Sequence, residues 1–417
     1  MPFNWVAPGA EDETLKSAQI RLLQAAVARA PDDPRPRQRL TMLLCDEGRA
    51  DEALASIKNR LATAPVDSAA WLELGWLHLG EGRYSDAEGA FARVDQESLS
   101  PQALLGLGTA LLRQEKWAAA LPLLTEAAER DPDSQPAARR AGTCQLQLGD
   151  GEALEASSRN AIARFSAVAW AISQLASALA LQERREELRV LLDYDRLVSI
   201  VDLEAPAPFT STTAFNAALA AELEQEAQFR WIGAESRRDS VVRSGRAAWV
   251  RAITKLAENQ DSSLGRLVNA FKSEADGYGR GSCADPEHPH RLARPEASTL
   301  ALNAHILRDE GRIAPHVHPN AWINAVYYVQ VPGALGQSSE GDGWLRFAQS
   351  DHADARIKRH WPVLRVEPKP GRLVIFPSFC SHHVTPTRSD DPRLTITFEV
   401  EGTSLAAGGH DRARISI

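Results

Sequence analysis

Histidines gather in the last third of this 417-residue chain, where ten of the eleven follow residue 280. The segment PHVHP carries His316 and His318, and residues two apart in an extended chain point to the same side. Both imidazoles can therefore face one pocket, and His382 follows far downstream in PSFCSHHVTP. Such a set suits imidazole-binding metals such as iron, copper, nickel or zinc. The sequence predicts a metal site formed by His316, His318 and His382.

A second chemical signal is an arginine in the final apolar segment, RLTITFEV. If this segment is a strand, Arg393, Thr395 and Thr397 share one face, and the apolar residues between them share the other. An arginine and a hydroxyl on an inward face suggest a bound anion, because the planar guanidinium matches a carboxylate and the hydroxyl adds a hydrogen bond. We therefore expect an anion site at Arg393 and Thr395.

The elements that must position these residues are short strands. From Thr299 onward the sequence is rich in Val, Ile, Tyr and Phe, and it is broken by PGALGQ, EGDG and PKPG. Many short strands with such breaks indicate a sandwich, a jelly roll or a closed barrel, and a jelly roll with helices packed outside fits best. The predicted strands are TLALNAHIL, AWINAVYYVQVP, GWLRFAQ, VLRVEP, RLVIFPS and RLTITFEVEG.

The first half of the chain is an array of helical repeats. Alanines recur in similar phrases at Ala53, Ala87, Ala120 and Ala153, about 33 residues apart, with a weaker fifth copy near residue 183. The second copy, with its tryptophan, glycine, alanine and phenylalanine, resembles the tetratricopeptide repeat. In such repeats small residues let two helices approach closely, and larger ones fill the gaps between repeats. This predicts an α-helical solenoid in which Trp71, Phe91, Ala87 and Ala120 lie between helices.

Two roles for the repeats are open. They can serve as a scaffold or oligomerisation surface, which would allow a homodimer, or their concave face can deliver a peptide or protein substrate. We place the repeat domain at residues 1–202 and a helical support region with a turn-rich loop at 203–298. Within the latter, 213–228 and 247–271 have helical spacing, and the loop at 277–294 is expected to be solvated, with His288 and His290 in it. Residues 299–417 complete the chain as the β-rich domain.

The ordered set HVHPNAW–INAVYYVQVP, GWLRF, PGRLVIFPSFCSHHVTP and Arg393 resembles the Fe(II)- and 2-oxoglutarate-dependent oxygenases related to prolyl hydroxylases. The resemblance implies a double-stranded β-helix (jelly roll) with flanking helices after the repeat solenoid. It also implies Fe(II), 2-oxoglutarate as cosubstrate, and molecular oxygen. His316 and His382 match the family's iron-binding histidines. Arg393 with Thr395 matches the clamp on the distal carboxylate of 2-oxoglutarate.

Strand AWINAVYYVQ supplies further contact candidates. Tyr328, Asn324 or Tyr327 would contact cosubstrate or substrate, depending on which face of the strand turns inward. The family's usual metal site has two histidines and one carboxylate in an HxD or HxE arrangement, whereas this chain has His318 at the second position. The third ligand is therefore His318, water, or a carboxylate such as Asp342 or Asp351.

The resemblance predicts a dioxygenase that hydroxylates an amino-acid side chain in a peptide or protein. Alternatives are an oxygenase of a free amino acid or small metabolite, a cupin-like metal-binding or hydrolytic protein, and a non-catalytic repeat adaptor with a degenerate β-domain. The formal charge of −8 and the lack of a basic, aromatic-rich patch argue against nucleic acid. No stretch is apolar enough for a membrane span, and four scattered cysteines suit a reducing cytoplasm.

Overall fold

In the computed structural model the chain forms two compact units, and the boundary between them in the sequence lies inside one helix. One unit holds the described residues up to Ser157, and the other holds those from Ser158 onward. The structure describes residues 10–30, 33–46, 48–94, 100–226, 230–232, 242–243, 246–251, 253, 257–281, 285–333, 335, 341–349, 354–402 and 415–416. The predicted domain bounds, 1–202, 203–298 and 299–417, stay a prediction.

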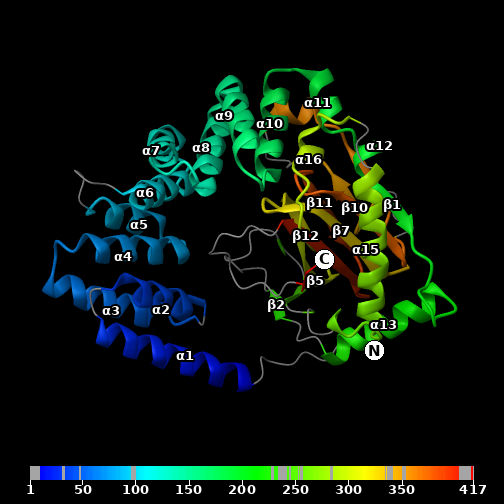
Figure 1. Cartoon of the computed structure of the whole chain (residues 1–417), viewed down its shortest axis with the longest axis horizontal. Helices are drawn as coiled ribbons and strands as arrows, with labels where there is room; N and C mark the ends of the chain where they lie inside the picture. The colour runs from blue at the N-terminus through cyan, green and yellow to red at the C-terminus, as the bar shows by residue number, and fades with distance from the viewer. Residues whose placement is uncertain are drawn as a thin grey trace. The chain divides into compact units, whose positions relative to one another are not determined.

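The first unit is built of helices, and each from α1 to α8 contacts the next (Figure 1). Alternate helices α2, α4, α6 and α8 also contact one another, as expected for stacked helix pairs. The predicted helical repeat array is thereby confirmed. The helices are α1 Ala10–Arg29, α2 Pro34–Asp46, α3 Ala50–Thr63, α4 Ser68–Gly80, α5 Tyr84–Phe91, α6 Pro101–Arg113, α7 Trp117–Arg130, α8 Gln135–Leu148 and, at the border of the units, α9 Gly151–Arg164.

Glycines let the repeat helices approach closely. A Cβ atom on Gly75 of α4 would lie 2.5 Å from the Phe91 ring, and one on Gly106 of α6 would also overlap that ring. Phe91 is fully buried between these two helices. Ala87 and Ala120 are fully buried too, whereas Trp71 is half-buried, packs against the core and donates its indole N–H to the Pro65 carbonyl at 2.8 Å. The small-beside-large packing read from the sequence is confirmed.

The turn inside each repeat contains one residue with a left-handed backbone. These residues recur at nearly the same interval as the repeats, and they are Gly48, Gly82, Glu115, Gly149 and Glu183, with φ between 56° and 73°. Glutamate therefore occupies, in the third and fifth turns, a conformation that glycine adopts without steric cost. The fifth turn joins α10 Ala169–Leu181 to α11 Arg185–Leu191, which supports a fifth helix pair near residue 183.

This fifth pair belongs by its contacts to the β-rich unit. Helix α10 contacts α16 Pro289–Leu292 and α17 Ala355–His360, both from the C-terminal half of the chain. The short helix α12 Tyr194–Leu197 follows, and the Tyr194 hydroxyl accepts a hydrogen bond from the Trp361 indole at 3.1 Å. Tyr278 in turn donates its hydroxyl to the Leu197 carbonyl at 2.8 Å. Residues 169–197 are thus packed against the β-domain.

Two antiparallel sheets form the core of the second unit. The larger sheet has the order β1-β10-β7-β12-β5-β4-β2, with β13 beside β5, and the smaller has the order β3-β6-β11-β8-β9. The predicted double-stranded β-helix (jelly roll) is confirmed. The strands are β1 Ser199–Asp202, β2 Arg230–Ile232, β3 Val242–Arg243, β4 Arg246–Arg251, β5 Ser298–Arg308, β6 Gly311–His316, β7 Ala321–Gln330, β8 Leu345–Phe347, β9 Leu364–Val366, β10 Arg372–Pro377, β11 His382–Thr387, β12 Arg393–Gly402 and β13 Ile415–Ser416.

Two helices cover one face of the larger sheet. Helices α13 Thr212–Glu226 and α15 Ser263–Gly281 bury apolar side chains against it (Figure 1), and the Phe271 ring of α15 stacks on Phe398 of β12 at 4.3 Å. The apolar residues of β12 all face this layer, as the alternation in RLTITFEV predicts. The opposite face of β12 is therefore turned toward the smaller sheet.

Two predictions for the support region are wrong. Residues 247–271 were expected to be helical, but 246–251 form β4, paired with β5, and the helix begins at Ser263. Pairing with β5 on one side and β2 on the other decides this segment, and periodicity alone does not reveal such partners. The segment 277–294 was expected to be a solvated loop, but α15 extends to Gly281, and His288 and His290 are buried. Their rings fill space between the Leu191 carbonyl and the Trp322 indole.

Candidate metal centre

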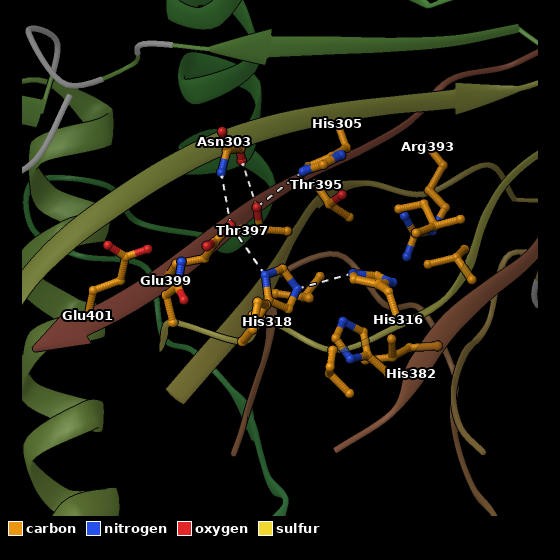
Figure 2. A pocket seen from close by; sticks show the side chains of 17 residues that line it. Asn303, His305, His316, His318, His382, Arg393, Thr395, Thr397, Glu399 and Glu401 are labelled. Carbon is orange, nitrogen blue, oxygen red and sulfur yellow. Dashed lines mark hydrogen bonds and ion pairs between the residues drawn. The ribbon is translucent and has the colours of Figure 1, made fainter. Parts of the chain in front are cut away.

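Three histidines meet between the two sheets (Figure 2). His316 ends β6 and His382 begins β11, and the two are direct cross-strand partners in the smaller sheet. His318 lies two residues beyond β6, where its backbone N–H donates to the Ser378 carbonyl at 3.1 Å. One ligand atom from each imidazole lies within 4.8 Å of the others. The structure therefore brings together the three histidines that the sequence singled out.

Hydrogen bonds to the backbone settle the tautomers of two of these rings. Nδ1 of His316 lies 2.8 Å from the Ala314 carbonyl, and Nδ1 of His382 lies 2.9 Å from the Cys380 carbonyl. A carbonyl oxygen only accepts, so each Nδ1 must carry the proton and each Nε2 presents a lone pair. Burial, with neighbouring His318, lowers the pKa of His316 to about 3, and burial with His316 holds the pKa of His382 well below its usual value. Both rings are neutral at pH 7.

The distance between two ring nitrogens fits a cation. Nε2 of His316 and Nε2 of His318 are 3.1 Å apart. Imidazole nitrogens about 2.1 Å from one ion would be about 3.0–3.4 Å apart, for angles between a right angle and the tetrahedral angle. Two lone pairs at this distance repel unless a proton or a metal ion lies between them. The donor set, three imidazoles, is one that iron and other transition metals accept.

Aromatic side chains support the His382 side of the cluster. The Phe376 ring packs edge-on against the His382 imidazole at 4.7 Å, and Phe347 packs against Phe376 at 4.9 Å. Tyr194 of α12 then contacts Phe347 at 5.5 Å. These side chains are all buried, so they form an apolar wall on this side of His382. A low-polarity wall of this kind strengthens interactions between charges in the site.

Arg393 is the second feature of the site, at the start of β12. Its side chain is buried, its Nε donates to the Gly343 carbonyl at 3.0 Å, and its guanidinium carbon lies 5.0 Å above the Tyr328 ring. Burial lowers the pKa of Arg393 but leaves it cationic at pH 7. Arg393 Nη2, the Tyr328 hydroxyl and Thr387 Oγ1 are all buried, and none forms a hydrogen bond of normal geometry with the described residues.

Gly343 lies beside this arginine and makes room for Leu335. Its φ is +67°, and a Cβ atom there would lie 2.7 Å from Leu335, 3.5 Å from Arg393 Cδ and 3.6 Å from Thr387 Oγ1. A buried guanidinium with an unsatisfied Nη2 is costly unless an anion binds it. A carboxylate supplies the acceptor that Nη2 lacks, so the Arg393 end fits a carboxylate such as the distal one of 2-oxoglutarate.

The histidines and Arg393 line one cavity of about 270 Å³. Strands β5, β6, β7, β8, β11 and β12 all contribute to its wall, so it lies between the two sheets. Figure 2 shows the histidine cluster between Arg393 at one end and Glu399 and Glu401 at the other. This volume is slightly below the range of about 300–1,000 Å³ typical of small-molecule pockets. A metal ion with a small dicarboxylate is therefore a suitable occupant.

Comparison with known proteins agrees with this geometry. The family model "Putative 2OG-Fe(II) oxygenase", where 2OG is 2-oxoglutarate, matches residues 304–399, and tetratricopeptide repeat models match residues 42–103 and 111–153. The chain combines tetratricopeptide repeats with a 2OG-Fe(II) oxygenase domain. No protein of curated function matches the chain.

Solved structures resemble parts of the chain. A prolyl-4-hydroxylase from Pseudomonas putida is 18% identical, covers 52% of this chain and 98% of its own, and gives a TM-score of 0.32. A Trichoplax adhaerens prolyl hydroxylase in complex with a hypoxia inducible factor peptide fragment is 14% identical, with coverages of 53% and 91% and a TM-score of 0.34. YrrB, a repeat protein with an unusual peptide-binding site, is 22% identical, with coverages of 42% and 91% and a TM-score of 0.36.

Alternation along β7 and β12 shows which of the other predicted contact residues face the cavity. Thr395 is buried on the cavity face of β12, two residues from Arg393. On β7, Val326 lines the cavity, so Asn324 and Tyr328 share its face, and both Asn324 side-chain polar atoms lack a partner among the described residues. Tyr327 faces the helical layer instead and donates its hydroxyl to Asn216 at 2.7 Å. Of the three candidates, Tyr327 points away.

Of the two carboxylates considered as a third ligand, Asp342 is not found at the cluster. Asp342 is not part of the cavity lining and pairs with Arg388 at 3.2 Å. Asp351 lies outside the described residues. His383, next to His382, is likewise absent from the lining, as alternation along β11 predicts. Among the described residues, His318 is the third group at the metal position.

Several cavity residues were missed by sequence reasoning. His305 lines the cavity beside Thr397, with its Nε2 3.2 Å from the hydroxyl, and burial lowers its pKa to about 4. Glu399 and Glu401 also line the cavity, and both are buried. The sequence did contain a signal for these two residues, because both continue the alternation of Arg393, Thr395 and Thr397 along the strand.

No described helix is long and apolar enough to cross a membrane.

Proposed function

We propose that this cavity is the active site of an Fe(II)- and 2-oxoglutarate-dependent dioxygenase that hydroxylates an amino-acid side chain in a peptide or protein. The observation that carries the proposal is the combination of two features in one cavity. Three imidazoles converge at one point, and a buried arginine with an unsatisfied Nη2 lies at one end. A generic metal site needs only the first feature, whereas a keto-diacid cosubstrate needs both.

In this proposal His316, His318 and His382 hold Fe(II), and Arg393 with Thr395 holds the distal carboxylate of 2-oxoglutarate. When bound, the metal and cosubstrate supply the oxidising chemistry with molecular oxygen. Arg393 orients the cosubstrate through its planar fork, and Tyr328, whose ring lies against the guanidinium, offers a hydroxyl to the same carboxylate. Phe347 and Phe376 keep water from the far side of His382. The protein thus binds, orients and shields.

A groove on the repeat unit supports a peptide substrate. It has a volume of about 470 Å³, and its lining includes apolar Trp71 and Leu74, the cations Lys58, Arg83 and Arg93, and one carboxylate, Asp86. Arg93 lies over the Trp71 ring at 5.3 Å. An apolar floor with cations around it suits an acidic peptide. Kinetics of the full chain test this: Lys58→Glu should raise KM for an acidic peptide, leave kcat unchanged, and leave turnover of a free amino acid unchanged.

Turnover of 2-oxoglutarate tests the proposed activity itself. Succinate released from 2-oxoglutarate in air should require Fe(II), and a hydroxylatable substrate should increase its rate. His382→Ala should abolish this release, whereas His383→Ala, a matched change on the opposite face of β11, should retain it.

Both rival functions predict no succinate release in this assay, and metal binding distinguishes one from the other. A cupin-like metal protein would bind metal without binding or consuming 2-oxoglutarate. A non-catalytic adaptor with a degenerate β-domain would neither bind the metal nor consume 2-oxoglutarate. Either result contradicts the proposed dioxygenase.

A further inference from the structure

Each histidine of the cluster has a hydrogen-bond acceptor near its Nδ1, but the acceptors differ. His316 and His382 use the backbone carbonyl two residues before them. His318 instead has a side chain from the other sheet: its Nδ1 lies 3.4 Å from Oε1 of Glu399 on β12 (Figure 2). This distance is longer than the usual N–H···O hydrogen bond of about 2.7–3.2 Å and lies within the range of about 4 Å for an ion pair. Glu399 therefore stands behind the one ring whose tautomer the backbone does not settle.

Glu399 is itself held in place. Its side chain is only 9% exposed, and Asn303 Nδ2 of β5 lies 3.4 Å from the same Oε1. Asn303 in turn accepts the Thr397 hydroxyl on its carbonyl at 3.3 Å. A buried carboxylate is costly unless it is hydrogen-bonded or paired with positive charge. Glu399 lies beside the proposed metal cluster, so a cation bound there would supply the positive charge.

The charges of the donor set give Glu399 a reason to be there. Three neutral imidazoles leave both positive charges of a divalent cation uncompensated, whereas a site with one carboxylate ligand compensates one of them. A carboxylate that accepts the Nδ1 proton of a metal-bound imidazole makes Nε2 a stronger donor and fixes the ring orientation. Glu399 thus brings negative charge to the site through His318 rather than by direct ligation.

We propose that Glu399 is a positioning residue for the metal: it holds His318 in the tautomer that presents Nε2 to the ion and supplies the charge that a ligating carboxylate would bring. This inference rests on the proposed function, because it assigns Glu399 to the same metal site. It assigns no catalytic contact to Glu399.

Binding of Co(II) alone, measured anaerobically by its visible absorption and by calorimetry on the full chain, tests the inference without turnover. Glu399→Ala should weaken Co(II) binding by roughly 10- to 100-fold, the usual cost of losing such a partner. Glu399→Gln keeps the shape and an acceptor oxygen but loses the charge, so it should weaken binding less. Glu401→Gln, two residues along the same cavity face, is the matched control and should leave binding unchanged.

A second background shows whether Glu399 acts through His318. In His318→Asp the metal gains a carboxylate ligand and Glu399 loses its imidazole partner, so a further Glu399→Ala should not weaken Co(II) binding. Coupling of this kind is what a double-mutant cycle measures. An equal loss in both backgrounds, or no loss in either, overturns the inference. A wild-type chain that fails to bind Co(II), or binds it equally well after His316→Ala, overturns the proposed function instead.

Discussion

Two buried places in this molecule are each built around glycine, and they are finished differently. In the repeat unit, Gly75 and Gly106 make room for the Phe91 ring, which fills the space completely. In the second unit, Gly343 makes room for Leu335 beside Arg393, and Arg393 Nη2 stays without an acceptor among the described residues. The first place is closed by apolar packing within the chain. The second keeps a buried cation that apolar packing cannot satisfy and that an anion would satisfy.

The largest expected effect tests whether the histidine cluster in the cavity beside Arg393 binds a metal. His316→Ala removes one of three convergent imidazoles, so it should lower metal affinity by more than the roughly 10- to 100-fold that loss of an outer partner costs. His305→Ala alters a histidine on the same cavity wall that is not in the cluster, and it should keep the metal. Anaerobic titration with Co(II) compares the two. Equal losses would mean that the cluster is not the metal site.

The next largest effect concerns the anion. Arg393→Lys keeps the charge but loses the planar fork, and a hydrogen bond to a charged group contributes about 1.5–3 kcal/mol. Loss of one such bond should weaken 2-oxoglutarate binding by roughly ten- to a hundredfold. Metal affinity should stay nearly unchanged, because Arg393 does not belong to the cluster. Calorimetry with a catalytically silent metal measures both, and an unaltered 2-oxoglutarate affinity would contradict the clamp.

Substitutions around Phe91 in the repeat unit should instead change the free energy of unfolding. Gly106→Ala forces a methyl group into the Phe91 ring, and overpacking of a core costs about 1–3 kcal/mol. Gly89→Ala, in helix α5 with nothing within 4 Å of the new methyl, should stabilise by about 0.5–1 kcal/mol through helix propensity. Urea unfolding of the repeat unit should therefore shift in opposite directions. A shift of the same sign in both would refute the close-packing explanation.

The smallest expected effect lies in the repeat turns. Glu115 has φ of 61°, a conformation that costs a residue with a side chain about 1–2 kcal/mol. Glycine relieves this cost but loses about 0.5–1 kcal/mol of backbone entropy, so Glu115→Gly should stabilise the unit by about 0.5 kcal/mol. Gly82→Ala, at the equivalent turn with φ of 72°, should destabilise it. If Glu115→Gly destabilised instead, its side chain would have to make stabilising contacts.

Repeats and strand alternation could be predicted from the chain alone because both are local periodicities. Spacing of the alanines located the helix pairs, and alternation in RLTITFEV put Arg393 and Thr395 opposite the apolar residues. The pair His316 and His318 was predicted for the same reason. Segment 246–251 and the buried pair His288 and His290 were misjudged, because their environment is set by β5 and by α10 to α12, which lie far away in sequence.

Local pattern by itself thus determined the fold class and the repeat period, and it singled out the histidines and the arginine that we propose carry the chemistry. Only the tertiary structure decided which groups surround them. Glu399 meets His318 from a strand 81 residues away, and Thr387 and Gly343 meet Arg393 from two further segments. The physical reason is that a cavity between two sheets is lined by many strands at once. Periodicity reports the face of each strand, but not which strands meet across the cavity.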